Sequence, residues 1–172
     1  MSSLHSKFYI LNSRRGFTLI EILIVVAIIG ILASVVLVGL GPVQRRGRDA
    51  RRLSDLREAQ NALELYFNKC GYYPGASQAG VNCSAYSANN SWGTMNPLAG
   101  MTGALIQSNM GIRQVPNDPT TGRTYLFATD GTGTSYVIGA TLEDDQNPAL
   151  REDIDGSVYG VGCDDPVYCT QF

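Results

Sequence analysis

Apolar and polar residues are distributed unevenly along this chain. From Ile22 to Leu40 there are 19 consecutive residues without a charged side chain. Built as a helix with a rise of ~1.5 Å per residue, this run would measure roughly 28 Å, close to the ~30 Å hydrocarbon thickness of a bilayer. The pattern predicts a membrane-spanning helix with a single carboxylate, Glu21, near its start.

A second helical pattern follows beyond residue 42. Apolar side chains recur there at steps of three and four and form one stripe, made of Leu53, Leu56, Ala59, Leu63, Tyr66, Phe67 and Cys70. Such a stripe predicts an amphipathic helix that packs on the rest of the chain. Gly71 and Pro74 should end this helix. Four charged residues are expected to face away from the stripe, namely Asp49, Arg52, Asp55 and Glu58.

The segment Gly39–Pro42 separates the two helical patterns. Proline lacks a backbone N–H donor, and glycine lowers helix propensity. We therefore expect a kink or local melting of the helix at this junction.

The remaining residues carry the signals of loops and strands. Residues 75–111 are rich in Gly, Ala, Ser and Asn and predict an irregular loop, with a short helix near Leu98–Gln107. Thr124–Ala128 and Ser135–Ala140 are β-rich, alternate in hydrophobicity and flank a glycine-rich turn, which predicts a hairpin. The tail from Ser157 to Phe172 is expected to add a further strand.

The net charge of −2 hides three zones of different sign. Residues 1–16 carry three basic residues and no acid, residues 42–69 carry seven basic and four acidic residues, and residues 70–172 carry three basic and ten acidic residues. The acidic distal part would repel phosphates, so we expect no nucleic-acid binding there. The basic segment would suit anionic headgroups or the acidic part of a neighbouring copy, while a solvated helix face explains it equally well.

The four cysteines, Cys70, Cys83, Cys163 and Cys169, all lie beyond the apolar run. Of the three possible pairings, we favour the most local, Cys70–Cys83 with Cys163–Cys169. An exported domain is oxidised, and the chain has no CxxC spacing, so disulfides are expected rather than metal ligation or redox chemistry. The chain also has no GxSxG elbow and no phosphate-binding loop, so we expect no enzymatic activity.

The segment from Arg14 to Glu21 resembles the class III signal of type IV prepilins and type II secretion pseudopilins. The likeness covers two arginines, glycine at the last leader position, phenylalanine at the first mature position and glutamate at the fifth mature position. It implies that a prepilin peptidase cuts between Gly16 and Phe17 and N-methylates Phe17. It also implies that Glu21 pairs with the N-terminal amine of an adjacent subunit during filament assembly.

The position of Glu21 also has a local explanation. A carboxylate inside a bilayer costs several kcal/mol, so such a residue usually has a partner. Thr18-x-x-Glu21 matches a helix capping box, in which the two residues satisfy each other's backbone. Assembly and capping can both hold, because cleavage creates the terminus that is being capped.

The resemblance implies an α+β pilin fold, with a long N-terminal helix packed on a small antiparallel sheet. We divide the chain into a leader (1–16), a membrane and filament-core helix (17–41) and a globular domain (42–172), the last comprising an amphipathic helix (42–70) and a loop plus sheet (71–172). The tail resembles the disulfide-closed C-terminal region of type IV pilins more than it resembles pseudopilins.

The implied function is that of a structural subunit in a type IV pilus-like or type II secretion filament. Before assembly the chain would span the inner membrane once, with its globular domain outside the cytoplasm, and would engage an assembly platform. The filament would then be extracellular or periplasmic. The basic residues of 45–52 argue against this orientation by the positive-inside rule. A membrane-anchored binding module that never polymerises is the alternative.

Six acidic residues crowd the stretch from Glu143 to Asp155. Clustered carboxylates suit Ca²⁺, which takes six to eight oxygen ligands. Major pseudopilins bind calcium in a comparable C-terminal loop, and on that resemblance we expect the ligands Asp144, Asp145, Asp153 and Asp155. A solvated acidic loop without an ion explains the same pattern.

Overall fold

The computed structural model describes residues 16–75, 83, 91–93 and 100–172, without the side chains of residues 37–39. The expected leader up to residue 15 and most of the expected loop over 75–111 lie outside the described residues. The chain forms two compact units, Met1–Gly41 and Pro42–Phe172.

Helix α1 runs from Leu19 to Cys70 and is helical through Pro42. The predicted local melting at Gly39–Pro42 is therefore wrong. Pro42 removes one backbone hydrogen bond from the helix, yet α1 is helical on both sides of it. The predicted end of the helix is confirmed. Gly71 has a φ of +81°, and its N–H donates to the carbonyl of Phe67 at 2.7 Å, as a glycine C-cap does.

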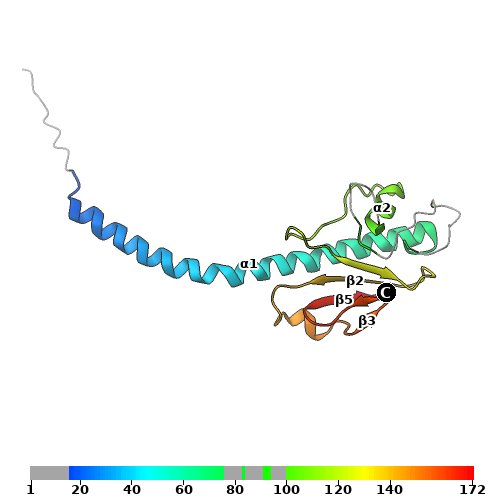
Figure 1. The fold of residues 1–172 in the computed structure, drawn as a ribbon. Helices are drawn as coiled ribbons and strands as arrows, with labels where there is room; N and C mark the ends of the chain where they lie inside the picture. Colours follow the sequence, from blue (N-terminus) through cyan, green and yellow to red (C-terminus); the bar gives the residue numbers. More distant parts are fainter. Residues whose placement is uncertain (1–15, 76–82, 84–90, 94–99) are drawn as a thin grey trace, which may run out of the picture. The chain divides into compact units, whose positions relative to one another are not determined.

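The second unit contains a three-stranded antiparallel sheet in the order β1-β2-β5 (Figure 1). Its strands are β1 (Leu126–Thr129), β2 (Tyr136–Thr141) and β5 (Val167–Gln171). The predicted hairpin and the predicted C-terminal strand are both confirmed, and in the hairpin Phe127 lies opposite Ile138. The other elements are α2 (Gly100–Gln107), η1 (Pro148–Arg151), β3 (Ser157–Val158) and β4 (Val161–Gly162).

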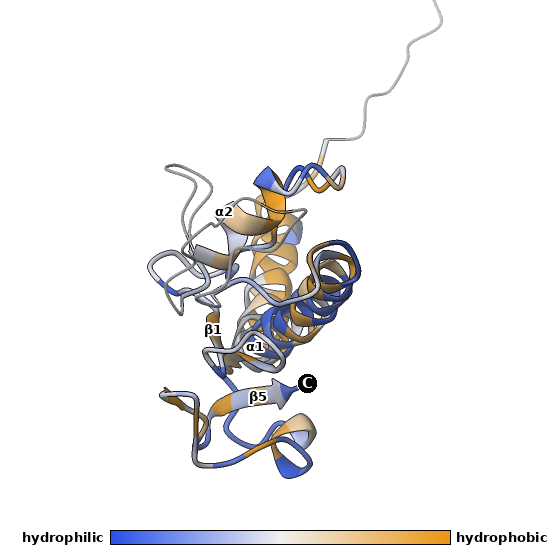
Figure 2. Cartoon of the chain, turned by 90° about the vertical axis from the view of Figure 1, so that its right-hand side faces the viewer, coloured by the Kyte–Doolittle hydropathy of each residue, from blue (hydrophilic) through white to orange (hydrophobic). Residues whose placement is uncertain are grey.

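The core of the second unit lies between the C-terminal half of α1 and the sheet. The buried face of α1 presents Leu56, Ala59, Leu63 and Tyr66, and the sheet contributes Phe127, Tyr136 and Ile138 to the same cluster. Trp92 is 2% exposed and donates through Nε1 to the carbonyl of Pro116 at 3.1 Å, so it anchors its segment to this core. The expected α+β architecture is thus confirmed. Figure 2 shows β5 passing from apolar to hydrophilic residues toward the C-terminus.

Two disulfides follow the local scheme expected from the sequence. Cys70 pairs with Cys83 with a Cα–Cα distance of 5.5 Å, and Cys163 pairs with Cys169 with a Cα–Cα distance of 5.7 Å. Gly139 makes room for the second bridge, since a Cβ at this position would lie 3.0 Å from Cys169 Sγ.

Candidate functional site

The expected processing segment lies at the start of α1. Gly16 and Phe17 are exposed and precede the first helical residue, Leu19. The Thr18 N–H and hydroxyl both donate to Glu21 Oε2 at 2.7 Å, and the Glu21 N–H donates back to the Thr18 hydroxyl at 3.3 Å. The capping box predicted from the sequence is therefore formed in the unprocessed chain.

The apolar part of α1 makes no core of its own. Residues Leu19–Val36 are long and apolar enough to cross a membrane, and none of this segment is buried. Ile22, Ile24 and Val25 are each about half exposed. An apolar surface this large is typical of an interaction with lipid or with other protein chains.

The prediction for the charged residues of the amphipathic segment is largely wrong. Asp49, Arg52 and Asp55 are buried, and only Glu58 faces solvent as expected. Asp49, Arg52 and Leu56 follow one another at steps of three and four, so they lie on the same face as the apolar stripe. The charges are tolerated there because each of them is paired.

Arg52 is the centre of this buried network. Its Nη1 donates to Asp49 Oδ1 at 2.7 Å, and its Nε donates to Asp118 Oδ2 at 2.7 Å. Its Nη2 reaches Thr120 Oγ1 at 2.8 Å and Glu143 Oε1 at 2.9 Å. Asp49 in turn accepts the backbone N–H of Glu143 at 2.9 Å. One arginine thus ties α1 to two loops that are distant in sequence.

The network lowers the pKa of two of its carboxylates, those of Glu143 and Asp118. A hydrogen bond from Arg48 lowers the pKa of Glu143 to about 2, and Arg52 acts in the same direction. Burial raises the pKa of Asp118, but hydrogen bonds from Arg52 and from the Thr120 N–H outweigh it and the net shift is downward. These carboxylates therefore remain charged, and paired, at neutral pH.

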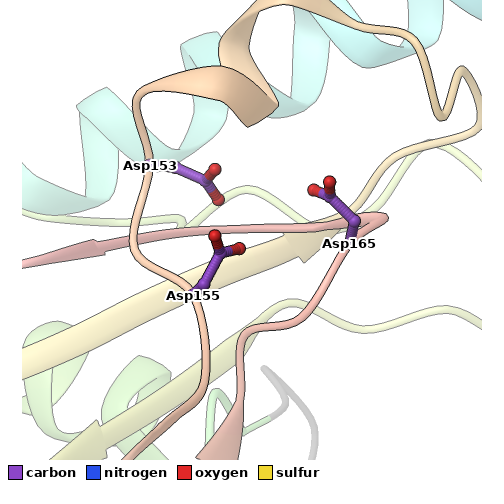
Figure 3. Close-up of side chains that lie close together, drawn as sticks. All are labelled: Asp153, Asp155 and Asp165. Carbon is purple, nitrogen blue, oxygen red and sulfur yellow. The ribbon is translucent and has the colours of Figure 1, made fainter.

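The carboxylates of Asp153, Asp155 and Asp165 converge, with one oxygen from each lying within 4.8 Å of the others (Figure 3). Asp153 and Asp155 follow η1, and Asp165 precedes β5. The cluster brings together two of the four ligands expected from the sequence, Asp153 and Asp155, with a third residue, Asp165. Asp144 lies outside it and pairs with Arg46 at 3.2 Å, and the exposed Asp145 also lies outside it.

Asp153 has the polar environment that a cation would complete. Its Oδ2 accepts the backbone N–H of Cys169 at 2.9 Å, while its buried Oδ1 has no hydrogen-bond partner. Burial raises the pKa of Asp153, the Cys169 N–H lowers it, and the charges of Asp155 and Asp165 raise it further. A hard divalent cation would offset two of the three negative charges, and hard cations of this kind take carboxylate oxygens as ligands.

Sequence reasoning missed Asp165 because it considered only the acidic run that ends at Asp155. A signal was present, since Asp164 and Asp165 lie between two cysteines expected to pair, Cys163 and Cys169. Closing that bridge brings the enclosed acids back toward the preceding loop.

Comparisons with known proteins bear on the N-terminal segment and on most of the chain. A family model described as the prokaryotic N-terminal methylation motif matches residues 11–37. The chain is 31% identical over 127 residues to the type II secretion system core protein G of Escherichia coli (strain K12), over 74% of this chain and 80% of that protein. It is 34% identical over 129 residues to a protein named "Probable minor fimbrial protein" of Dichelobacter nodosus, over 74% of this chain and 77% of that protein. No solved structure matches the chain.

Proposed function

Since the chain belongs to the type IV pilin and pseudopilin family, we propose that it is a membrane-inserted subunit that polymerises into a filament through its N-terminal helix. The family is structural rather than enzymatic, and it includes subunits of type II secretion systems and of type IV pili. Polymerisation, the peptidase that processes the chain and the assembly platform that receives it are parts of this proposal.

One observation carries the proposal. An apolar helix segment of 18 residues, Leu19–Val36, is not buried within the part of the chain that the structure describes and has a carboxylate near its beginning. Lipid covers such a surface before assembly, and the helices of other subunits would cover it in a filament. Because lipid tails are as apolar as the helix itself, the exchange gains little from hydrophobic burial. Assembly must therefore draw on side-chain packing and on the pairing of Glu21.

Cleavage after Gly16 would create the partner for Glu21. The new N-terminal amine of Phe17 would carry a positive charge. It would lie at the start of α1, four residues before Glu21. In an apolar filament core this amine and the carboxylate of an adjacent subunit would attract each other strongly, because little water screens them. Both charges also lose hydration when they are buried, and this cost offsets much of their attraction. Their pairing would therefore fix the register of adjacent subunits as much as it stabilises the filament.

The proposed location follows from the family and from the disulfides. We place the globular unit outside the cytoplasm, where oxidation of the four cysteines is expected, and the chain in the inner membrane before assembly. The arginines that follow the apolar segment then lie on the outer side, against the positive-inside rule. Four of them are paired with carboxylates of the same chain, namely Arg46, Arg48, Arg51 and Arg52, which reduces their weight as topology signals.

Electron microscopy of cells with and without the gene tests the filament proposal. We expect filaments that an antibody against the globular unit labels, and we expect them to disappear on deletion and to return on complementation. Long surface filaments in the sheared fraction would identify a pilus, and short filaments retained by the cell would identify a secretion pseudopilus. A chain found in the membrane fraction and absent from every filament would instead support a non-polymerising anchored module.

We further propose that the cluster of Asp153, Asp155 and Asp165 holds Ca²⁺. The support is chemical, because one oxygen from each of the three carboxylates lies within 4.8 Å of the others and the buried Oδ1 of Asp153 has no hydrogen-bond partner. Bound calcium would offset most of the negative charge of this cluster and stabilise the fold, by about 2.7 kcal/mol at 100 times its Kd.

Thermal unfolding of the full chain in detergent micelles tests the calcium proposal. Calcium should raise the Tm of the wild type, and Asp165→Asn should abolish that increase. Asp145→Asn is the matched control, since it removes the same charge from an exposed residue outside the cluster. An equal calcium response in both variants would exclude the cluster as the site.

A further inference from the structure

The disulfide between Cys163 and Cys169 encloses one of the clustered acids. The bridge spans six positions in sequence, and Asp165 lies within the ring that it closes. The other two members of the cluster, Asp153 and Asp155, belong to the preceding loop and lie outside the ring. The position of Asp165 relative to the other two acids therefore depends on the contacts between the disulfide ring and that loop.

Both cysteines supply these connections through their backbones. The Cys169 N–H donates to Asp153 Oδ2 at 2.9 Å, and the Cys169 carbonyl accepts the N–H of Ile154 at 3.4 Å. At the other end, the Cys163 N–H donates to the carbonyl of Gly156 at 2.7 Å. The Gly156 N–H returns a hydrogen bond to Asp164 Oδ1 at 3.2 Å. The loop that carries Asp153 is thus held at both ends by the residues of one disulfide.

The bridge itself is held by the sheet. Cys163 and Cys169 are buried and pack with Ala128 and Val137 from β1 and β2. Gly139 leaves no Cβ that would push against the sulfur of Cys169. These contacts give the acidic cluster a rigid support on one side.

We propose that the Cys163–Cys169 disulfide is a positioning element of the cation site and raises its affinity for calcium. The inference rests on the calcium proposal above. Three carboxylates within 4.8 Å repel one another when no ion is bound, so an open loop would let Asp165 move away. Closing the ring restricts that movement before binding, and calcium then loses less affinity to ordering of the loop. The site is completed only once the cysteines have been oxidised.

Calcium titration by calorimetry tests this role on the full chain in detergent micelles. Replacing both Cys163 and Cys169 by Ala should weaken calcium binding at least tenfold. Replacing both Cys70 and Cys83 by Ala is the matched control, because it also removes one disulfide, at the C-terminal end of α1, and should leave the affinity within about twofold. Equal calcium affinity in the wild type and the Cys163/Cys169 variant would overturn the inference and leave the calcium site standing. A wild type that binds no calcium would overturn both.

A second measurement avoids the risk that the variant fails to fold. Coupling between two equilibria is reciprocal, so calcium must stabilise the disulfide by the same factor by which the disulfide strengthens calcium binding. We would equilibrate the wild type in dithiothreitol redox buffers, in which each bridge takes up two electrons and two protons to become two thiols. Alkylation and mass spectrometry would then count the thiols.

Calcium should lower the reduced-to-oxidised ratio of Cys163–Cys169 at least tenfold relative to a chelator. The Cys70–Cys83 bridge in the same chain should change much less, and magnesium should have little effect on either. An equal effect of calcium on both bridges would point to general stabilisation of the fold and would overturn the inference.

Discussion

Glu21 combines a local role with a proposed intermolecular one. In the unprocessed chain, the N–H and the hydroxyl of Thr18 both bind the same carboxylate oxygen, Oε2. That arrangement caps the start of α1 and explains why the carboxylate is tolerated beside an apolar run. Cleavage after Gly16 would add a charged amine next to this cap, and the amine of a neighbouring subunit could then bind the same carboxylate.

Substituting these two residues separately distinguishes the roles. We expect Glu21→Ala to leave cleavage after Gly16 intact and to abolish or severely reduce filament assembly, because the neighbouring amine loses its counter-charge. Thr18→Val removes the hydroxyl of the cap but keeps the carboxylate, so it should assemble far better. N-terminal mass spectrometry and the yield of sheared filaments are the measurements. Wild-type filament yields from Glu21→Ala would contradict the proposed pairing.

Arg52 is the centre of the buried ion network of the globular unit. Its side chain is fully buried and binds three carboxylates, those of Asp49, Asp118 and Glu143. Removing one partner of a buried ion pair leaves the other charges without compensation, at a cost of about 3–5 kcal/mol. Without Arg52, the buried carboxylates of Asp49 and Asp118 would lose the positive charge that compensates them.

We therefore expect Arg52→Ala to lower the free energy of unfolding by about 3–5 kcal/mol in urea titrations. Arg46→Ala is the matched control, because Arg46 pairs with Asp144 from an exposed position and should contribute at most about 1 kcal/mol. A loss for Arg52→Ala no larger than that for Arg46→Ala would show that the buried network adds little to stability.

Between elements, the network replaces apolar packing where α1 meets two loops. One loop carries Asp118 and Thr120 before β1, and the other carries Glu143 after β2. Leu56 and the residues after it pack on the sheet, whereas Arg52 binds the loops that flank the sheet. Charged contacts of this kind make the junction sensitive to acid.

The stability of the globular unit should decrease as the pH falls. The pKa of Glu143 is about 2 in the folded chain, against ~4.3 for an unfolded glutamate. The folded state thus binds this proton more weakly, so the contribution of Glu143 is complete above pH ~4.3 and is lost as the pH falls toward 2. The net downward shift of the pKa of Asp118 acts in the same direction.

Unfolding followed as a function of pH measures this effect. Glu143→Gln should flatten the dependence of stability on pH over that range, since the glutamine has no proton to bind. Glu58→Gln, on the exposed face of α1, should leave the dependence close to that of the wild type. Parallel curves for wild type and Glu143→Gln would contradict the assignment.

The sequence predicts an element correctly where a local pattern of residues specifies it. The β-rich alternation around Asp130–Ser135 predicted the hairpin, and the spacing of the cysteines predicted both bridges. The helical step of three and four located the buried face of α1 from Leu56 onward. Asp49 and Arg52 follow the same step, but their charge predicts exposure. Apart from each other, they bind Asp118, 66 residues from Arg52, and the backbone of Glu143, 94 residues from Asp49, and one-dimensional periodicity does not encode these contacts.

The acidic cluster shows the same limit. Asp153 and Asp155 are neighbours in sequence and were expected together, whereas Asp165 reaches them only through the ring closed by Cys163 and Cys169. Asp144 was expected to join them but binds Arg46 instead. Composition predicted the kind of ligand, and the disulfide and the loop that it closes decided which residues meet.

The two units of the chain carry different parts of the function. The globular unit has its own core, buried ion network and disulfides, so it is the part suited to an exposed surface. The N-terminal unit contains an apolar helix segment without buried contacts and has the sequence of a processing site. Family membership joins these features into one account, in which the first unit would be processed, inserted in the membrane and then buried in a filament.

Mass spectrometry of the N-terminal peptide from the sheared filament fraction tests this account most directly. The predicted result is a chain that begins at N-methylated Phe17 and is recovered from filaments. A chain that remains in the membrane and begins at Met1, or one that is cut at any site other than between Gly16 and Phe17, would contradict it.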